Sequence, residues 1–297
     1  MKTFDELLLN NRTKKQLLSI INRPSHGLVI IGPSGSGKLT IAQAIAIELL
    51  GLDSIKKLIT YAYFIHIKLA EGQQDIPIDS IRQITRLLKL KVPDAKDTSR
   101  IVLIEDAQNL SEPAQNAMLK MLEEPPLGTF FILSVESEGD LLPTITSRMQ
   151  SLVVYSVNLQ QSLLFFEQKY KKEQIASAWR LSQGSVGLMA AILAQDNNHP
   201  LKLAIDQAKA FLRNDTYGKL LLADVLSRDK VQLSIFLEAL ARLMAALHRN
   251  SLSQKHSNTA QQNKLLISRK LVYDLQKALK ANVSPKLITL ELSLNLV

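Results

Sequence analysis

A glycine-rich loop near the start of the chain has the residue types needed to hold a phosphate group. The segment "GPSGSGK", residues 32–38, follows the apolar run "LVII" and precedes a helical pattern rich in Ala, Ile and Leu. In such loops the glycines free backbone N–H groups to surround a phosphate, and the lysine neutralises its charge. We therefore predict a nucleotide-binding loop whose candidate contact residues are Gly32, Gly35, Gly37, Lys38 and Thr40.

The position that normally provides a metal-binding hydroxyl carries Leu39. In phosphate loops the residue after the lysine is a Ser or Thr whose hydroxyl binds magnesium, and a leucine cannot replace it. Thr40 lies about 100° further round the helix, so it could substitute only if the helix began in a shifted register. We expect ATP or ADP to bind weakly or as a structural ligand, with Mg²⁺ present only together with the nucleotide.

A second candidate element is the run "RIVLIED", which ends in Glu105 and Asp106. An apolar strand followed by two carboxylates is typical of a metal-holding group and a water-orienting base, as in a Walker B element. The usual order is Asp then Glu, and here it is reversed. Because the two side chains differ by one methylene group, this reversal should misplace both carboxylates by about 1 Å, and such a displacement can lower a rate on the order of a hundredfold. The alternative is a pair of exposed acids at a strand end.

The elements that must position these residues alternate between short apolar runs and helical patterns. Continuous apolar runs such as "GLVIIG" and "TFFILSV" are typical of buried parallel strands. We predict an α/β domain over residues 1–157, with a parallel sheet covered by helices on both faces. Asp79 and Ser111 are the predicted caps of two of these helices.

After about Val157 the patterns become helical. We predict a small helical domain over residues 158–200, ending in the polar linker "DNNHP", and a second helical domain over residues 201–297 with about five helices. The polar stretch 251–263 is expected to be a loop. The apolar spacing of the tail from Pro285 fits a strand or a helix, and Ser284 followed by Pro285 favours the helix. Trp179 and Tyr273 are expected in the core.

Composition narrows the class of protein. The chain has 297 residues and no cysteine, which excludes disulfides and thiolate zinc sites. Its apolar runs are too short to cross a bilayer, so we expect a cytoplasmic protein. From residue 201 onward, 15 basic residues stand against 7 acidic ones. This excess favours nucleic acid or an acidic partner, and the alternative is a set of solvated lysine faces.

The segments "SEPAQNAMLKMLEEPP" and "TFFILSVESEGDLLPTITSRM" resemble the signature of the clamp-loader branch of AAA+ proteins. Within that branch the chain is most similar to the delta-prime subunits of bacterial DNA polymerase III. The runs "SHGLVIIGPSGSGK", "IPIDSIRQI", "LSQGSVGLMAAIL" and "NVSPKLITLELSL" extend the resemblance from about residue 3 to the C-terminus.

The resemblance implies specific roles. Arg148, in "SRM", falls on the arginine finger, which reaches the γ-phosphate of ATP bound by a neighbouring subunit. The domain at residues 158–200 would be a helical lid, and the one at 201–297 a collar that holds subunits in a ring. The implied partners are tau/gamma-type motor and delta-type subunits, and through the complex the sliding clamp and primer–template DNA.

The sequence also departs from an active motor of this family. Glu136 falls about where a neutral polar sensor is expected, and Gly187 falls where a second sensor is an arginine. Many relatives carry a four-cysteine zinc module that this chain lacks, so no zinc is expected.

The leading hypothesis is a delta-prime-like clamp-loader subunit with little or no ATP hydrolysis of its own. One alternative is an ATP-hydrolysing tau/gamma-type motor subunit. A second alternative is an AAA+ adaptor that binds DNA through its basic C-terminal domain.

Overall fold

A computed structural model describes residues 2–70, 73, 75–89, 98–253 and 259–296. The chain divides into two compact units, Met1–Phe165 and Phe166–Val297, and each is described by itself. The division into domains at residues 1–157, 158–200 and 201–297 remains a prediction.

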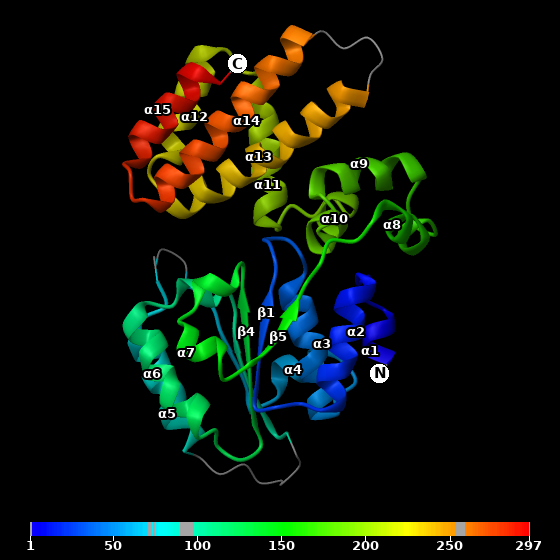
Figure 1. Cartoon of the computed structure of the whole chain (residues 1–297), viewed down its shortest axis with the longest axis vertical. Helices are drawn as coiled ribbons and strands as arrows, with labels where there is room; N and C mark the ends of the chain where they lie inside the picture. Colours follow the sequence, from blue (N-terminus) through cyan, green and yellow to red (C-terminus); the bar gives the residue numbers. More distant parts are fainter. Residues whose placement is uncertain (1, 71–72, 74, 90–97, 254–258, 297) are drawn as a thin grey trace. The chain divides into compact units, whose positions relative to one another are not determined.

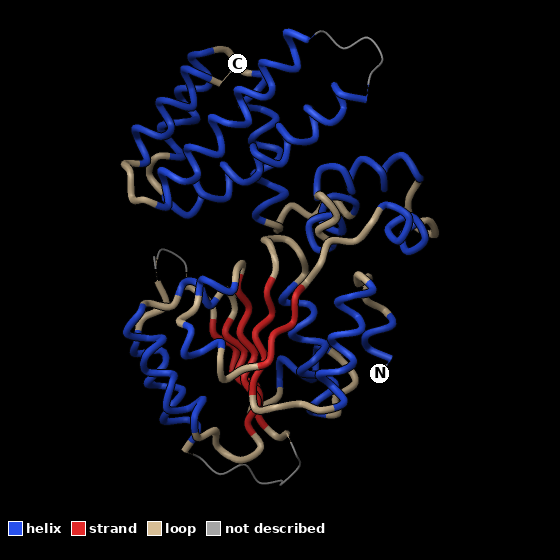
Figure 2. Tube along the Cα trace, in the orientation of Figure 1, coloured by secondary structure: helices blue, strands red, loops and turns tan. Residues whose placement is uncertain are grey.

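The first unit is built on a five-stranded parallel sheet with the order β2-β3-β4-β1-β5 (Figures 1 and 2). Its inner strands are almost entirely apolar and buried, as a sheet covered on both faces requires. The predicted α/β class with a parallel sheet is therefore confirmed. The strands are β1 Gly27–Ile31, β2 Phe64–Ile67, β3 Arg100–Ile104, β4 Thr129–Val135 and β5 Gln150–Val153.

Helices cover both faces of this sheet (Figure 1). Successive strand residues point to opposite faces, so Leu28 and Ile30 join one apolar cluster while Val29 joins the other. The first cluster includes helices α1 Lys2–Asp5, α2 Asn11–Asn22, α3 Lys38–Leu50 and α4 Ile55–Thr60. The second includes α5 Ile78–Leu88, α6 Glu112–Glu123 and α7 Pro143–Thr146, with the short 3-10 turns η1 Ala107–Asn109 and η2 Glu138–Asp140 nearby in the chain.

The two predicted helix caps have different outcomes. Ser111 caps α6 as expected, because its side chain accepts the N–H of Ala114. The prediction for Asp79 is wrong: α5 begins at Ile78, so Asp79 lies inside the first turn, where it pairs with Arg82. A carboxylate there still faces the positive end of the helix dipole.

The second unit is helical throughout its described part. Helix α8, Leu159–Phe166, crosses the division, and it is followed by α9 Lys172–Ser182 and α10 Val186–Leu193. The five helices expected after residue 200 are present, and the tail is helical as predicted. They are α11 Pro200–Arg213, α12 Thr216–Leu226, α13 Lys230–Ser253, α14 Thr259–Lys280 and α15 Pro285–Asn295.

Two expectations for this unit are wrong. The polar stretch 251–263 is helical on both sides of residues 254–258, which lie outside the described residues. Tyr273 is 55% exposed, with Lys277 over its ring at 4.6 Å, so it is not a core residue. Trp179 is half-buried.

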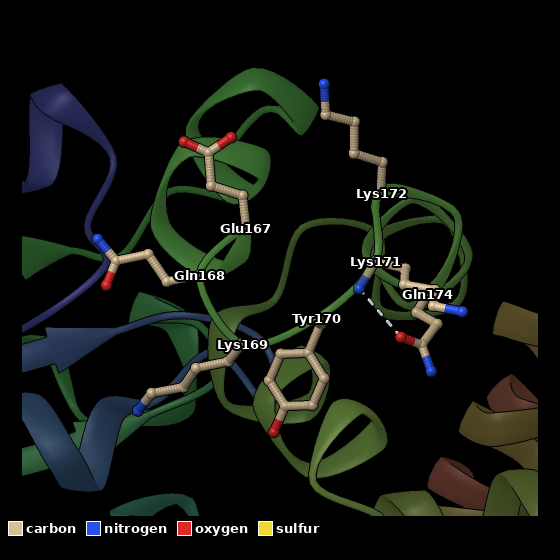
Figure 3. A pocket seen from close by; sticks show the side chains of 7 residues that line it. All are labelled: Glu167, Gln168, Lys169, Tyr170, Lys171, Lys172 and Gln174. Carbon is tan, nitrogen blue, oxygen red and sulfur yellow. Dashed lines mark hydrogen bonds between the residues drawn. The ribbon is translucent and has the colours of Figure 1, made fainter.

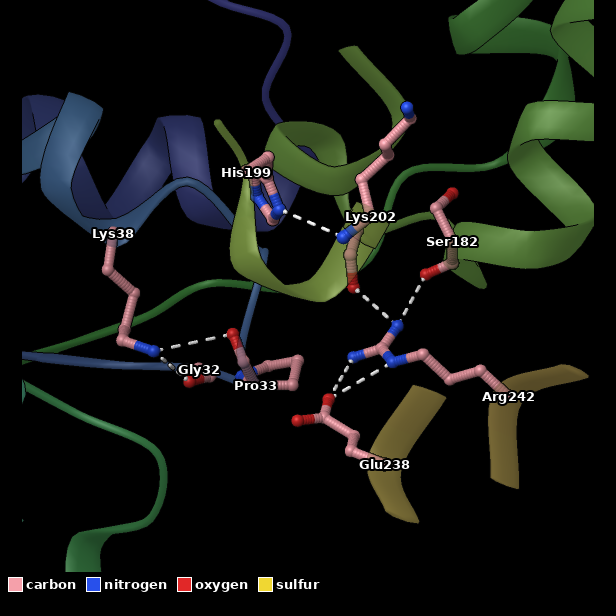
Figure 4. Close-up of polar contacts among 9 residues, drawn as sticks. Gly32, Pro33, Lys38, Ser182, His199, Lys202, Glu238 and Arg242 are labelled. Atoms are coloured by element: carbon pink, nitrogen blue, oxygen red, sulfur yellow. Dashed lines mark hydrogen bonds and ion pairs between the residues drawn. The ribbon is translucent and has the colours of Figure 1, made fainter. Parts of the chain in front are cut away.

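Helix α13 is the central element of the second unit. Among the described residues, its segment Lys230–Leu252 passes a length and hydropathy test for a membrane span, but 56% of the tested window is buried inside the protein. Its Arg242 is buried and donates to the carbonyl of Ser182 over 2.8 Å and to Glu238 over 2.8 Å (Figure 4). These contacts join α13 to the end of α9 with the charge of the arginine compensated.

Candidate functional site

The predicted phosphate loop has the backbone that such a loop needs. It runs from the end of β1 to the start of α3, and Gly35 and Gly37 have φ values of 72° and 91°. These left-handed conformations strain any residue with a side chain, which explains both glycines. No side chain caps α3. The N–H groups of its first turn are therefore available to an anion.

Lys38 is folded back onto the loop that contains it. Its Nζ donates to the carbonyls of Gly32 over 2.9 Å and of Pro33 over 3.4 Å (Figure 4). The side chain is buried, and the nearest carboxylate oxygen, from Asp106, is 4.0 Å away. A positive charge is thus held at the centre of the loop, where it would face a phosphate.

The two residues after this lysine do not offer a hydroxyl to a metal. Helix α3 begins at Lys38, so its register is not shifted. Leu39 is half-buried and packs against the apolar cluster under the helix, and Thr40 is exposed. At 100° per residue, Thr40 points away from the direction that Leu39 takes.

The acidic pair is separated by the structure. Glu105 lies 3.0 Å from the Nε2 of His66, at the end of the neighbouring strand β2. Asp106 is the residue that faces Lys38, at 4.0 Å. The structure therefore brings Asp106 to the phosphate loop and pairs Glu105 with a histidine, whereas the sequence suggested that the two acids act together.

Asp106 has a constrained backbone and a perturbed acidity. Its φ is 49°, and its N–H donates to the hydroxyl of buried Ser134 over 2.9 Å. Burial raises the pKa of the Asp106 carboxyl, with a smaller contribution from Glu105, while Lys38 opposes the shift. Ser134 was not singled out from the sequence, because a serine inside an apolar strand gives no signal of its own.

The two positions at which the resemblance implies sensors lie in different units of the chain. Glu136 directly follows β4 and is exposed, and Gly187 lies in α10. Among the described residues there is no group of three His, Cys, Asp or Glu side chains that could hold a metal ion.

Arg148 lies near the N-terminal ends of the parallel strands, whereas the phosphate loop lies at their C-terminal ends. It comes just before β5, whose first residue, Gln150, pairs with Leu28 near the start of β1. The phosphate loop follows Ile31, at the other end of β1. At about 3.3 Å per residue, the strand separates the two ends by roughly 10 Å.

Hydrogen bonds hold the Arg148 side chain at this end of the strands. The guanidinium donates to Glu123 over 2.7 Å and to the carbonyl of Thr144 over 2.8 Å. Its side chain is 35% exposed. Glu123 belongs to the "EEPP" segment at residues 123–126, but no sequence pattern connects it with Arg148.

A surface cavity of about 640 Å³ lies elsewhere, between α8 and α9 (Figure 3). One short stretch of chain forms it, and the side chains of this stretch spread apart. The main-chain N–H of Lys171 donates a hydrogen bond to the side chain of Gln174. None of the predicted site residues lines it. The lining residues are Glu167, Gln168, Lys169, Tyr170, Lys171, Lys172 and Gln174.

Known proteins resemble this chain in sequence. The model of the family described as "DNA polymerase III, delta subunit" matches residues 9–158. The DNA polymerase III subunit delta' of Haemophilus influenzae is 27% identical over 63% of this chain and 59% of its own length. The Escherichia coli subunit delta' is 32% identical over 43% of this chain and 38% of its own length.

A subunit of another type is also similar. The DNA polymerase III subunit tau of Bacillus subtilis is 27% identical over 63% of this chain and 34% of its own length. The matches thus span from about a third to three fifths of the length of these curated relatives.

Proposed function

Because this chain belongs to the DNA polymerase III delta subunit family, we propose that it is a delta-prime-like subunit of a clamp loader. In this role it helps to load a sliding clamp onto primer–template DNA, together with tau/gamma-type and delta-type subunits. It supplies Arg148 to ATP held by a neighbouring subunit. It hydrolyses little or no ATP itself.

The observation that carries this proposal is the position of Arg148. Arg148 lies where the parallel strands begin, and the phosphate loop lies where they end. The arginine therefore cannot contact a phosphate that is held by its own chain's loop. It is partly exposed, so it is accessible to a nucleotide held by an adjacent chain. A planar guanidinium donates two parallel hydrogen bonds to phosphate oxygens and stabilises the charge that develops during transfer.

The chain's own loop supports weak or absent hydrolysis. Half-buried Leu39, which packs against the apolar cluster, stands at the position where a metal-binding hydroxyl is required. Glu105 is engaged by His66, which leaves Asp106 as the acid that faces Lys38. A loop that retains its backbone and its lysine can still hold a nucleotide as a structural ligand.

The C-terminal helices support a role in assembly. Helices α12 and α15 pack against each other, and each exposes apolar side chains at helical spacing, which places them on one face of their helix. Such stripes suit the helices of another subunit better than water. They consist of Tyr217, Leu221 and Val225 on α12 and of Leu287, Leu290 and Leu294 on α15.

The test is Arg148→Ala in a complex reconstituted with the other loader subunits. Removal of an arginine supplied in trans should lower DNA-dependent ATP turnover by about a thousandfold at the sites that use it. Arg148→Lys should also be impaired, because lysine keeps the charge but not the planar fork. Arg82→Ala, at an exposed position on α5, is the matched control. Unchanged turnover with Arg148→Ala would rule the proposal out.

A second candidate function is an ATP-hydrolysing motor subunit of the tau/gamma type. It is favoured by the left-handed Gly35 and Gly37 of the phosphate loop and by the similarity to the Bacillus subtilis tau subunit. This candidate requires that the isolated chain hydrolyses ATP with magnesium and that Lys38→Ala abolishes the activity. Our proposal expects no turnover by the isolated chain.

A further inference from the structure

Arg148 is tied to a second element of the fold by a carboxylate. Its Nη2 donates to Oε1 of Glu123 over 2.7 Å, and its Nη1 donates to the carbonyl of Thr144 over 2.8 Å and to the hydroxyl of Ser147 over 3.4 Å. Thr144 and Ser147 belong to the same turn of chain as the arginine and would move with it. Glu123 is the last residue of α6, so it links the guanidinium to a different helix.

Helix α6, which carries Glu123, is held in place by several contacts. Met118 and Met121 are buried in the core beneath it, and Ser111 caps its first turn. The Gln115 side chain accepts the N–H of Leu142, the residue that precedes α7, over 2.9 Å. Contacts to α7 and its flanking residues are therefore made near the start of α6 as well as at its end, and Glu123 occupies a defined place relative to the arginine.

We propose that Glu123 is a positioning residue for Arg148, which holds the guanidinium in the orientation that meets the neighbouring subunit's nucleotide. This inference rests on the proposed function. A long arginine side chain has many rotamers, and a contact made before assembly reduces the freedom that is lost when the phosphate arrives. Rates of group transfer are sensitive to displacements of about 1 Å.

The same contacts leave room for a phosphate. A guanidinium has five N–H groups, and the three described bonds leave Nε–H and one N–H of Nη2 for other acceptors. The ion pair is partly exposed, with 35% of the Arg148 side chain and 49% of the Glu123 side chain accessible. Water weakens such a pair. Glu123 can thus orient the arginine without blocking it.

The test uses Glu123→Gln in the reconstituted complex, with ATP turnover measured over a range of ATP concentrations. We expect kcat to fall about tenfold and KM for ATP to stay within about twofold, because the arginine is displaced while the neighbour's nucleotide site is intact. Glu124→Gln removes the same charge one residue away and is the matched control. It should keep the parental kcat.

A double variant distinguishes positioning from a structural role. If Glu123 acts only through the arginine, Glu123→Gln combined with Arg148→Ala should turn over no more slowly than Arg148→Ala alone. The inference is overturned if Glu123→Gln leaves kcat unchanged or raises it, or if the two losses multiply. Should Arg148→Ala itself leave turnover unchanged, the proposed function fails. If only Arg148→Ala is impaired, the proposed function stands and the role of Glu123 is refuted.

Discussion

At the scale of single residues, two adjacent carboxylates have different environments. Glu105 pairs with His66, while Asp106 lies beside Lys38 with its backbone held by Ser134. Successive residues along an extended chain point to opposite sides, which by itself separates two adjacent side chains, and Asp106 also has a left-handed backbone just after the strand. The residue types of a Walker B element were readable from the sequence, but this dihedral was not.

The first prediction concerns the charge of Asp106. Burial raises its pKa above the ordinary 3.8, so ionisation at pH 7 disfavours the folded state. Asp106→Asn should therefore raise the free energy of unfolding at pH 7, by less than about 0.5 kcal/mol because the side chain stays 46% exposed and water screens it. Asparagine also tolerates the left-handed backbone.

Urea unfolding at several pH values measures this effect. The gain should shrink as the pH falls through the raised folded-state pKa and disappear below 3.8, where Asp106 is protonated in the folded and unfolded chains alike. Asp106→Ala is the control for backbone strain and should destabilise the chain. A gain that grows on acidification would show that the carboxylate is stabilised in the folded state.

The second prediction concerns Leu39. Leu39→Thr restores the hydroxyl of an ordinary phosphate loop, yet we predict that the isolated chain still hydrolyses almost no ATP. Glu105 remains paired with His66, and Glu136 and Gly187 remain at the positions where the resemblance implies sensors. The variant should lose about 1 kcal/mol of stability from the lost apolar contact. The measurement is magnesium-dependent phosphate release. Rapid ATP hydrolysis by the Leu39→Thr chain would mean that Leu39 alone prevents hydrolysis in the parent chain.

At the scale of elements, helices and strands whose prediction rests on side-chain periodicity agree well with the structure. The parallel strands and the apolar stripe of α6 follow from side-chain spacing, whereas the helical tail follows from Ser284 and Pro285, because its spacing fits a strand as well as a helix. The contact between Glu123 and Arg148 was not predictable, since 25 residues separate them and only the packing of α6 beside α7 brings them together. The cap of α5 was missed because several starting residues satisfy the same apolar spacing.

The third prediction concerns the start of α11, where His199 is the cap. Its Nδ1 accepts the N–H of Lys202, which only an unprotonated nitrogen can do. Burial lowers the pKa of His199 below the ordinary 6.5, and Asp196 opposes the shift. The unfolded chain therefore binds a proton more readily. The stability from this cap is present above pH 6.5 and is lost as the pH falls through the folded-state pKa.

Replacement by asparagine checks this assignment. His199→Asn keeps a capping oxygen that does not titrate, so the loss of about 1 kcal/mol between pH 7.5 and 5 should disappear in the variant. Urea unfolding of both chains at the two pH values measures the difference. An equal loss in both chains would assign the pH dependence to another group.

At the scale of the whole molecule, the exposed apolar stripes of α12 and α15 set the fourth prediction. Leu221→Asp, 54% exposed in the parent chain, should leave the chain folded but lower its recovery with the other loader subunits at least tenfold. Ile59→Asp, 68% exposed on α4 in the first unit, is the control for an added surface charge. Size-exclusion chromatography of the mixtures measures assembly. Normal assembly of Leu221→Asp would exclude α12 from the interface.

The central claim is that the chemistry of this chain is exerted on a neighbour's nucleotide and not on its own. The most direct measurement compares ATP turnover of complexes that carry Lys38→Ala or Arg148→Ala in this chain. If the loop of this chain does not hydrolyse ATP, as we propose, Lys38→Ala leaves turnover near the parental rate. We predict that Arg148→Ala removes most of it. The opposite pattern, with loss on Lys38→Ala and none on Arg148→Ala, would contradict the account.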